Sequence, residues 1–264
     1  MSISMRYAVT NLITSSTLDS VSSEDTLYTM DNLYDKRQSK PFRFTSNSDE
    51  WILVDLGADT AVRFVSLLEH DFVSPSVLQI QAYSQATGKP ADNGDPADHT
   101  ETLTLCPEND NIFKRFSASQ TYRYWMLSVT DASAPSNMGL GQFMLSPDAS
   151  AFTRNHNWGF SEKLVINKST QTTGYGQVWV AHKAMHKEFG LTYQHIADSE
   201  IDGEWLTFIM AVKGHVPFVF IPDDSDDKCW YVNMQSDWDM LREFINMTNF
   251  SLELREQSRG IAVL

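Results

Sequence analysis

The stretch Trp51-Ile52-Leu53-Val54-Asp55-Leu56-Gly57 predicts a β-rich fold. It is a short apolar run, and a second apolar run occupies residues 61–68 after Gly57-Ala58-Asp59-Thr60. Glycine and aspartate are turn formers, so the pattern predicts a strand, a tight turn and a second strand.

The segments on the carboxyl side continue this β pattern. Residues 77–83 alternate, with Leu78, Ile80 and Ala82 on one face and glutamines on the other, which is the period of a half-buried strand. Residues 123–130 and 139–145 are further strand candidates, and the polar stretch 84–111 predicts a long surface excursion with a short strand at 102–106. Short strands joined by polar loops predict a β-sandwich jelly roll over residues 1–148.

The second half of the chain has a different pattern. Ser146-Pro147-Asp148-Ala149-Ser150 is small and polar, as linkers are, so we expect a second domain at residues 152–264. It is predicted to be β-rich (α+β) with one or two helices. Its strand candidates are two segments around Trp179 and residues 189–193, then residues 217–221, 229–234 and 250–256.

A helix is predicted at residues 199–213 of this second domain. Ser199 is a suitable N-cap and Gly214 a suitable residue just beyond the C-terminus. One apolar stripe at helical spacing is formed by Ile201, Trp205, Phe208, Ile209 and Val212. A second, short helix is predicted after Ser236, carrying Trp238, Leu241, Phe244 and Ile245.

Composition restricts the classes of partner. The chain has 264 residues, 42% of them hydrophobic, and a net charge of -14, so it can bury a core but repels nucleic acids and anionic membranes. No run approaches the ~18 apolar residues of a membrane span, and the N-terminus lacks a signal-peptide pattern, so we expect a soluble product without an export signal. The two cysteines, Cys106 and Cys229, are expected to be free thiols in a reducing cytoplasm.

Motifs of catalysis are absent from the sequence, so we expect neither an enzyme nor a bound cofactor. His182 and His186 would share a face on a helix, but their flanks predict a strand, which separates them by about 13 Å, too far for one metal ion. The acidic loop with Asp92, Asn93, Asp95 and Asp98 offers oxygen ligands for calcium or is simply solvated, and the second interpretation is favoured.

The first domain resembles the galactose-binding-like (discoidin, F5/8 type C) family of β-sandwiches. The resemblance is carried by residues 32–35 (NLYD), 42–46 (FRFTS), 51–57 (WILVDLG), 123–127 (RYWML) and 139–143 (GLGQF). It implies a jelly roll whose loops at one end bind sugars, lipids or proteins, often beside a structural calcium ion.

The same resemblance suggests site residues. Asp35 stands where the family has a loop aspartate, which makes it a candidate for calcium, although a turn residue is the favoured alternative. Lys36 replaces the usual glycine, and Gln142 stands where a glutamate often helps to bind calcium. Candidate contacts to a glycan or a partner protein are Tyr34, Arg43, His70 and Phe72, with Tyr28 beside them, because aromatic faces stack on sugar rings.

The second domain resembles distal-tail and minor-tail subunits of bacteriophages. The resemblance is carried by the helix 199–213 and by residues 214–223 (GHVPFVFIPD), 230–233 (WYVN) and 252–258 (LELREQS). It implies a subunit that closes rings around a tail axis.

Together, the two resemblances predict a virion structural protein of a phage tail tip or baseplate, assembled in the host cytoplasm. Its expected partners are copies of itself in a ring, other phage tail proteins and a host-surface glycan, but no nucleic acid and no membrane. The alternative is a free-standing, carbohydrate-binding, lectin-like protein.

Overall fold

The computed structural model describes residues 5–37, 40–46, 49–73, 77–105, 110–130, 137–147, 150–151, 160–223, 228–235, 240–244 and 246–257. Within these ranges the chain forms two compact units. The N-terminal unit contains residues 10–150 together with 228–229, and the C-terminal unit contains residues 5–9, 151–223 and 230–257. The predicted domain limits had placed residues 5–9 in the first domain. They lie in the second because β1 (Arg6–Ala8) pairs with β12 (Phe218–Ile221).

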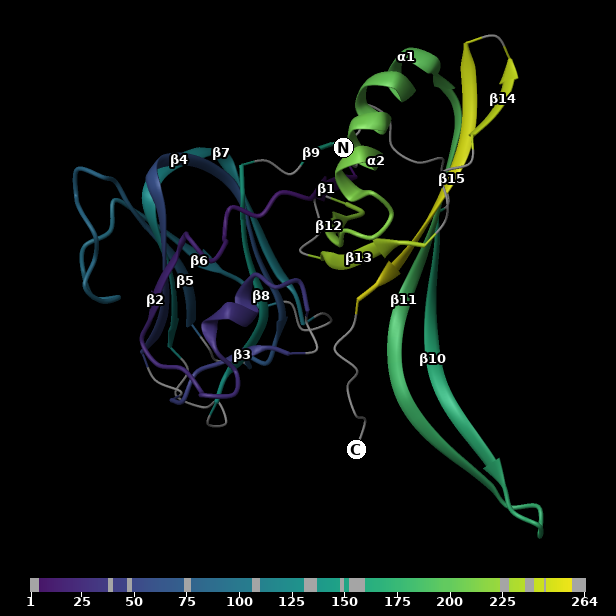
Figure 1. Cartoon of the computed structure of the whole chain (residues 1–264), viewed down its shortest axis with the longest axis horizontal. Helices are drawn as coiled ribbons and strands as arrows, with labels where there is room; N and C mark the ends of the chain where they lie inside the picture. Colours follow the sequence, from purple (N-terminus) through teal and green to yellow (C-terminus); the bar gives the residue numbers. More distant parts are fainter. Residues whose placement is uncertain are drawn as a thin grey trace. The chain divides into compact units, whose positions relative to one another are not determined.

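The N-terminal unit is an antiparallel β structure around a large apolar core, with a second, smaller buried cluster (Figure 1). Its described strands form one sheet in the order β3-β8-β4-β7-β5-β6, with β2 paired to β4. The elements are β2 (Leu18–Val21), the 3-10 helix η1 (Met30–Leu33), β3 (Phe42–Arg43), β4 (Glu50–His70), β5 (Val77–Tyr83), β6 (His99–Leu103), β7 (Ile112–Thr130) and β8 (Gly139–Ser146).

Two long strands, β4 and β7, run side by side through this unit and bend over the core in Figure 1. The predicted tight turn at Gly57 is therefore wrong: β4 is one strand, with register shifts against β7 between Asp55 and Thr60 and again between Val62 and Phe64. Gly57 has φ +81° and donates its N–H to Asp55 Oδ1, so the turn-forming residues make a bulge instead of a reversal.

The alternation predicted for residues 77–83 is only partly observed. Leu78, Ile80 and Ala82 are buried as expected, but Gln81 is buried as well. Its amide donates to the Asn93 carbonyl, and its Oε1 accepts a hydrogen bond from the Tyr83 hydroxyl. The long loop after β5 thus covers the polar face of this strand.

The C-terminal unit is a second antiparallel sheet with one helical segment. The sheet order among the described residues is β10-β11-β15-β13-β12-β1-β9, with β14 paired to β15. The remaining strands are β9 (Ser150–Ala151), β10 (Ser161–Thr172), β11 (Val178–Ala197), β13 (Trp230–Met234), β14 (Met240–Phe244) and β15 (Met247–Glu256). The short helix predicted after Ser236 is wrong over residues 240–244, because this segment pairs with β15 as a strand; Trp238 and Ile245 lie outside the described residues.

The helical segment consists of α1 (Asp198–Glu200), the π-helical turn η2 (Ile201–Trp205) and α2 (Leu206–Val212). The predicted stripe is confirmed, since Ile201, Trp205, Phe208 and Val212 are buried and Ile209 packs against the same core. The predicted N-cap is displaced: Ala197 holds that position, and the Asp198 N–H is satisfied by the Asn246 carbonyl. Both units are β-rich, and together they confirm the predicted fold class. None of the described helices is long and apolar enough to cross a membrane.

Candidate binding surface

Arg43 lies where β3 meets β8 in the N-terminal unit, opposite Gly139 in the strand register. Its Nη1 donates to the Asn137 carbonyl at 2.7 Å and lies 3.3 Å from Asp71 Oδ2. The side chains of Arg43 and Asp71 are 29% and 31% exposed, so solvent reaches both. The guanidinium is thus fixed in place and still accessible.

Asp71 follows β4 directly and connects this strand end to β8. Its Oδ1 accepts a hydrogen bond from the Gly139 N–H, and its own N–H donates to the Gly139 carbonyl at 3.1 Å. A Cβ at position 139 would lie 3.0 Å from Asp71 Oδ2, so glycine permits this close approach. The carboxylate therefore holds both the backbone of β8 and the Arg43 side chain.

Tyr28 places an aromatic ring beside the guanidinium. The Arg43 Cζ lies 5.5 Å from the centre of the Tyr28 ring, within the range of a cation–π interaction. The backbone fixes this geometry, because the Arg43 N–H donates to the Tyr28 carbonyl. Tyr28, Arg43 and Asp71 form what we call the loop-end surface.

Tyr34 lies at the end of η1, an element that contacts both β3 and β8. Its hydroxyl donates to Asp31 Oδ1 at 3.0 Å. The pKa of the Tyr34 hydroxyl is raised, mainly by partial burial and secondly by the hydrogen bond to Asp31. The hydroxyl therefore stays protonated and acts as a donor at neutral pH. Tyr34 is partly exposed and adds a second aromatic ring with a hydroxyl group to this end of the unit.

His70 and Phe72, the other two predicted contact residues, are both only 5% exposed. Their rings stack on each other at 5.2 Å, and the Phe72 N–H donates to His70 Nδ1. They cannot offer a ring face to a ligand, because Phe72 belongs to the apolar core. Asp71 lies between them in the sequence and is not among the predicted contact residues.

Asp35 makes local contacts. Its Oδ1 accepts the Arg37 N–H at 2.8 Å, and its Oδ2 pairs with the Arg37 guanidinium at 2.8 Å, while Lys36 has φ +65°. This geometry agrees with the turn-residue alternative. No group of three or more His, Cys, Asp or Glu side chains in the described part of the chain is arranged for a metal, and calcium at Asp35 stays a prediction.

The other metal candidates also have local partners. In the acidic loop, Asp92 and Asp95 accept backbone N–H groups of Gly94 and Ala91, and Asp98 accepts Ser84 and Thr87. His182 and His186 both lie on β11, as expected for a strand; the side chain of His182 lies outside the described residues. Of the cysteines, Cys229 is buried and forms no disulfide with any described residue, and Cys106 lies outside the described residues.

Among the solved structures similar to about half of this chain are several carbohydrate-binding modules. The lectin domain of lectinolysin in complex with Lewis B antigen is 15% identical, with a TM-score of 0.40, and covers 49% of this chain and 92% of its own. A Streptococcus pneumoniae fucose binding module is 12% identical (TM-score 0.41; 53% and 96% covered), and chitosan-binding module 1 from a Paenibacillus sp. IK-5 chitosanase/glucanase is 17% identical (TM-score 0.39; 52% and 97% covered). These scores are too low to assign a function. No protein-family model and no curated protein matches the sequence.

Proposed function

We propose that this protein binds glycans through the loop-end surface of its N-terminal unit. The observation that carries the proposal is the Arg43 guanidinium, which is held by Asp71 and Asn137, stacked on Tyr28 and still partly exposed. A guanidinium fixed in this way donates to neighbouring hydroxyl groups with little loss of side-chain entropy.

The rest of the surface supplies the other groups that sugar recognition needs. The Asp71 carboxylate accepts hydrogen bonds from hydroxyl groups, and the Tyr28 ring offers an apolar face to the C–H groups of a sugar ring. The lectin-like alternative thus has a physical basis in named residues of one unit.

The variant Arg43→Ala tests this proposal on a printed glycan array and by titration calorimetry with the best-bound sugar. Charge-assisted hydrogen bonds contribute about 1.5–3 kcal/mol, so we expect affinity to fall by about 10- to 100-fold. The matched control is Lys114→Ala, which removes an exposed cation of the same unit that pairs with Glu101 on a different part of the sheet. The control should bind as the unmodified protein does, since exposed ion pairs contribute little.

Unchanged sugar binding in Arg43→Ala, at an unchanged melting temperature, would exclude this surface as the glycan site. Loss of binding in both variants would indicate a general effect of charge and would also contradict the proposal.

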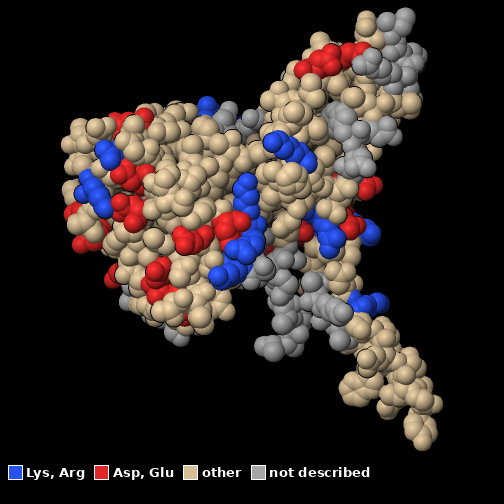
Figure 2. Space-filling view, viewed as in Figure 1, with Lys and Arg blue, Asp and Glu red and all other residues tan. Residues whose placement is uncertain are grey.

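A second candidate function, a structural subunit of a larger assembly, is favoured by a different observation. Beyond their contact with β15, strands β10 and β11 continue as a two-stranded ribbon (Figure 1). Residues 169–180 at its end contain no charged side chain, and the end is uncharged on the face shown in Figure 2. Its exposed apolar residues include Tyr175, Val178, Trp179 and Val180.

An isolated two-stranded ribbon is marginally stable in water, and exposed apolar patches mark contact surfaces. We therefore expect Trp179→Ala to reduce any self-association, which light scattering over a concentration series measures. Association that is equal in Trp179→Ala and in the unmodified chain would exclude the ribbon end as the contact. The phage-tail role and its ring stay predictions.

A further inference from the structure

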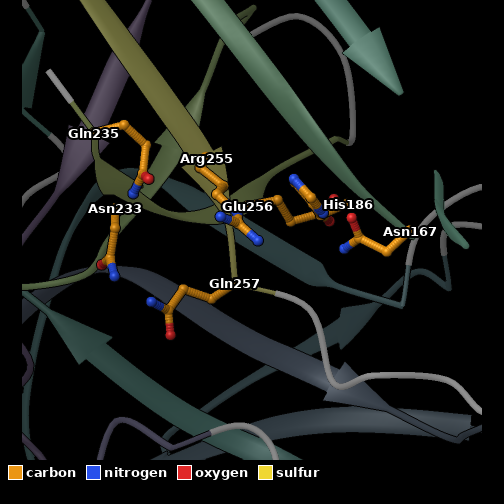
Figure 3. A pocket seen from close by; sticks show the side chains of 7 residues that line it. All are labelled: Asn167, His186, Asn233, Gln235, Arg255, Glu256 and Gln257. Atoms are coloured by element: carbon orange, nitrogen blue, oxygen red, sulfur yellow. The ribbon is translucent and has the colours of Figure 1, made fainter. Parts of the chain in front are cut away.

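A groove runs across the polar face of the C-terminal sheet, on strands β10, β11, β13 and β15. It consists of two adjoining hollows of about 360 and 480 Å³, which share Gln235 in their linings. These volumes fall in the usual range for small-ligand sites. Figure 3 shows the first hollow, where side chains from separate strands converge on one space; it is lined by Asn167, His186, Asn233, Gln235, Arg255, Glu256 and Gln257.

The strand register explains why this face is polar. Asn233 lies opposite Arg255, Arg255 opposite Glu188, and Glu188 opposite Lys163, so one polar row crosses four strands. The neighbouring residues Phe189 and Leu254 also line the second hollow, but their side chains are buried in the core of the unit. The groove thus lies on the polar side of a sheet whose apolar side is already covered.

Gly190 lines the second hollow. A Cβ at this position would lie 2.5 Å from Ser161 Oγ, on the strand opposite. Gly190 does not have a positive φ, so its backbone conformation does not require glycine. Glycine weakens a strand interior, and its presence often marks a place where another group approaches closely; here this group is the Ser161 hydroxyl.

Two polar groups in the groove have no partner among the described residues. Asn233 Oδ1 is buried without a hydrogen bond, and Arg255 makes neither an ion pair nor a hydrogen bond. The carboxylates beside them are engaged: Glu188 interacts with Lys163 and His186, and Glu256 accepts the Lys187 N–H. A buried acceptor without a partner is unfavourable and is expected to be satisfied by a bound group.

The distribution of charge selects the class of ligand. An anionic ligand would be repelled by the carboxylates of Glu188, Glu253 and Glu256. A cationic ligand would be repelled by the side chains of Lys163 and Arg255. A peptide strand would need a sheet edge, and this groove lies on a face. The groove contains side-chain amides, the unpaired Arg255 guanidinium and the unpaired Asn233 Oδ1. These groups suit a neutral ligand that both donates and accepts hydrogen bonds, as a ligand rich in hydroxyl groups does.

We propose that this groove is a second binding site, for a short neutral saccharide, with Arg255 and Asn233 as the hydrogen-bonding residues and Gly190 in the lining. This site goes beyond the loop-end surface and shares no residue with it.

The test uses the full chain on a printed array of neutral and sialylated oligosaccharides, followed by titration calorimetry with the best-bound neutral trisaccharide. Arg255→Ala and Asn233→Ala should each weaken neutral-sugar binding at the groove by about tenfold or more. Gly190→Val should abolish it by placing a side chain in the second hollow, with thermal melting as the check on folding. The matched control is Lys168→Ala, an exposed cation of β10 that does not line either hollow and should leave binding unchanged.

The outcomes separate this proposal from the loop-end surface. Binding that is reduced but not lost in each of Arg43→Ala and Arg255→Ala, and that disappears in the double variant Arg43→Ala/Arg255→Ala, supports two sites. Binding lost only in Arg255→Ala supports the groove and refutes the loop-end surface. Binding unaffected by Arg255→Ala and Asn233→Ala, or confined to sialylated sugars, overturns the groove proposal.

Discussion

Single residues decide which side chains are exposed at the loop-end surface. His70 and Phe72 turn inward and stack on each other, which leaves Asp71 between them to contact Arg43. A second carboxylate of the same unit, Asp55, has a purely structural arrangement. It forms a two-pronged ion pair with Arg123 at 2.7 and 2.9 Å and also accepts the Gly57 N–H.

The hydrogen bonds from Arg123 lower the pKa of Asp55 below its ordinary value of 3.8. A group with a depressed folded pKa stabilises the folded state above its unfolded pKa, and this contribution disappears as the pH falls through the folded value. We therefore expect Asp55→Asn to lower the melting temperature at pH 7, with the difference from the unmodified protein shrinking below pH 3.8. A difference that is constant from pH 7 to pH 2.5 in thermal melts would contradict this account.

At the scale of elements, the helical segment ends in an unusual way. Lys213 has φ +50°, the left-handed region, and Gly214 follows with φ +68°. The Lys213 N–H reaches the Ile209 carbonyl at 2.7 Å, and the Val216 N–H reaches the Val212 carbonyl, so the last turn is closed by these two residues. The left-handed position at the end of a helix is usually occupied by glycine. Here Lys213 occupies it, and Gly214 is the next residue.

Lys213→Gly should stabilise the C-terminal unit by about 0.5–1 kcal/mol, because the left-handed conformation is costly for a residue with a Cβ. Chemical denaturation followed by tryptophan fluorescence measures the change, since Trp205 is buried in the same core. Lys213→Ala is the control and should change stability little, because alanine keeps the strained Cβ. Equal stability of the glycine and alanine variants would show that the conformation carries no strain.

At the scale of the whole molecule, the chain builds its second unit from both ends of the sequence. Residues 6–8 pair with β12, and Met5 is buried in the core of the C-terminal unit with Tyr7 packed against it. Tyr7 meets Phe208 of the helix edge-to-face at 4.6 Å. The C-terminal unit therefore includes a segment that is separated from the rest of this unit, in the sequence, by the whole N-terminal unit.

Removal of residues 1–9 should destabilise the C-terminal unit selectively, because it deletes a strand and buried apolar contacts. Differential scanning calorimetry is expected to show a lowered transition for this unit and an unchanged one for the N-terminal unit. Tyr7→Ala should have a smaller effect in the same direction. A truncated chain that melts as the full chain does would show that β1 contributes little.

Local pattern in the sequence determined the β-rich class, most strand segments and the apolar stripe of the helix, because side-chain periodicity depends only on near neighbours. Tertiary structure decided what periodicity cannot encode. Pairing along all of β4 and β7 converted a predicted turn into a bulge, and pairing with β15 made residues 240–244 a strand. Tyr34 and Arg43 were named as candidate contacts from the sequence and stay predictions. The burial of His70 and Phe72, the contact of Asp71 with β8 and the groove at Arg255 depend on strands that are distant in sequence meeting in register.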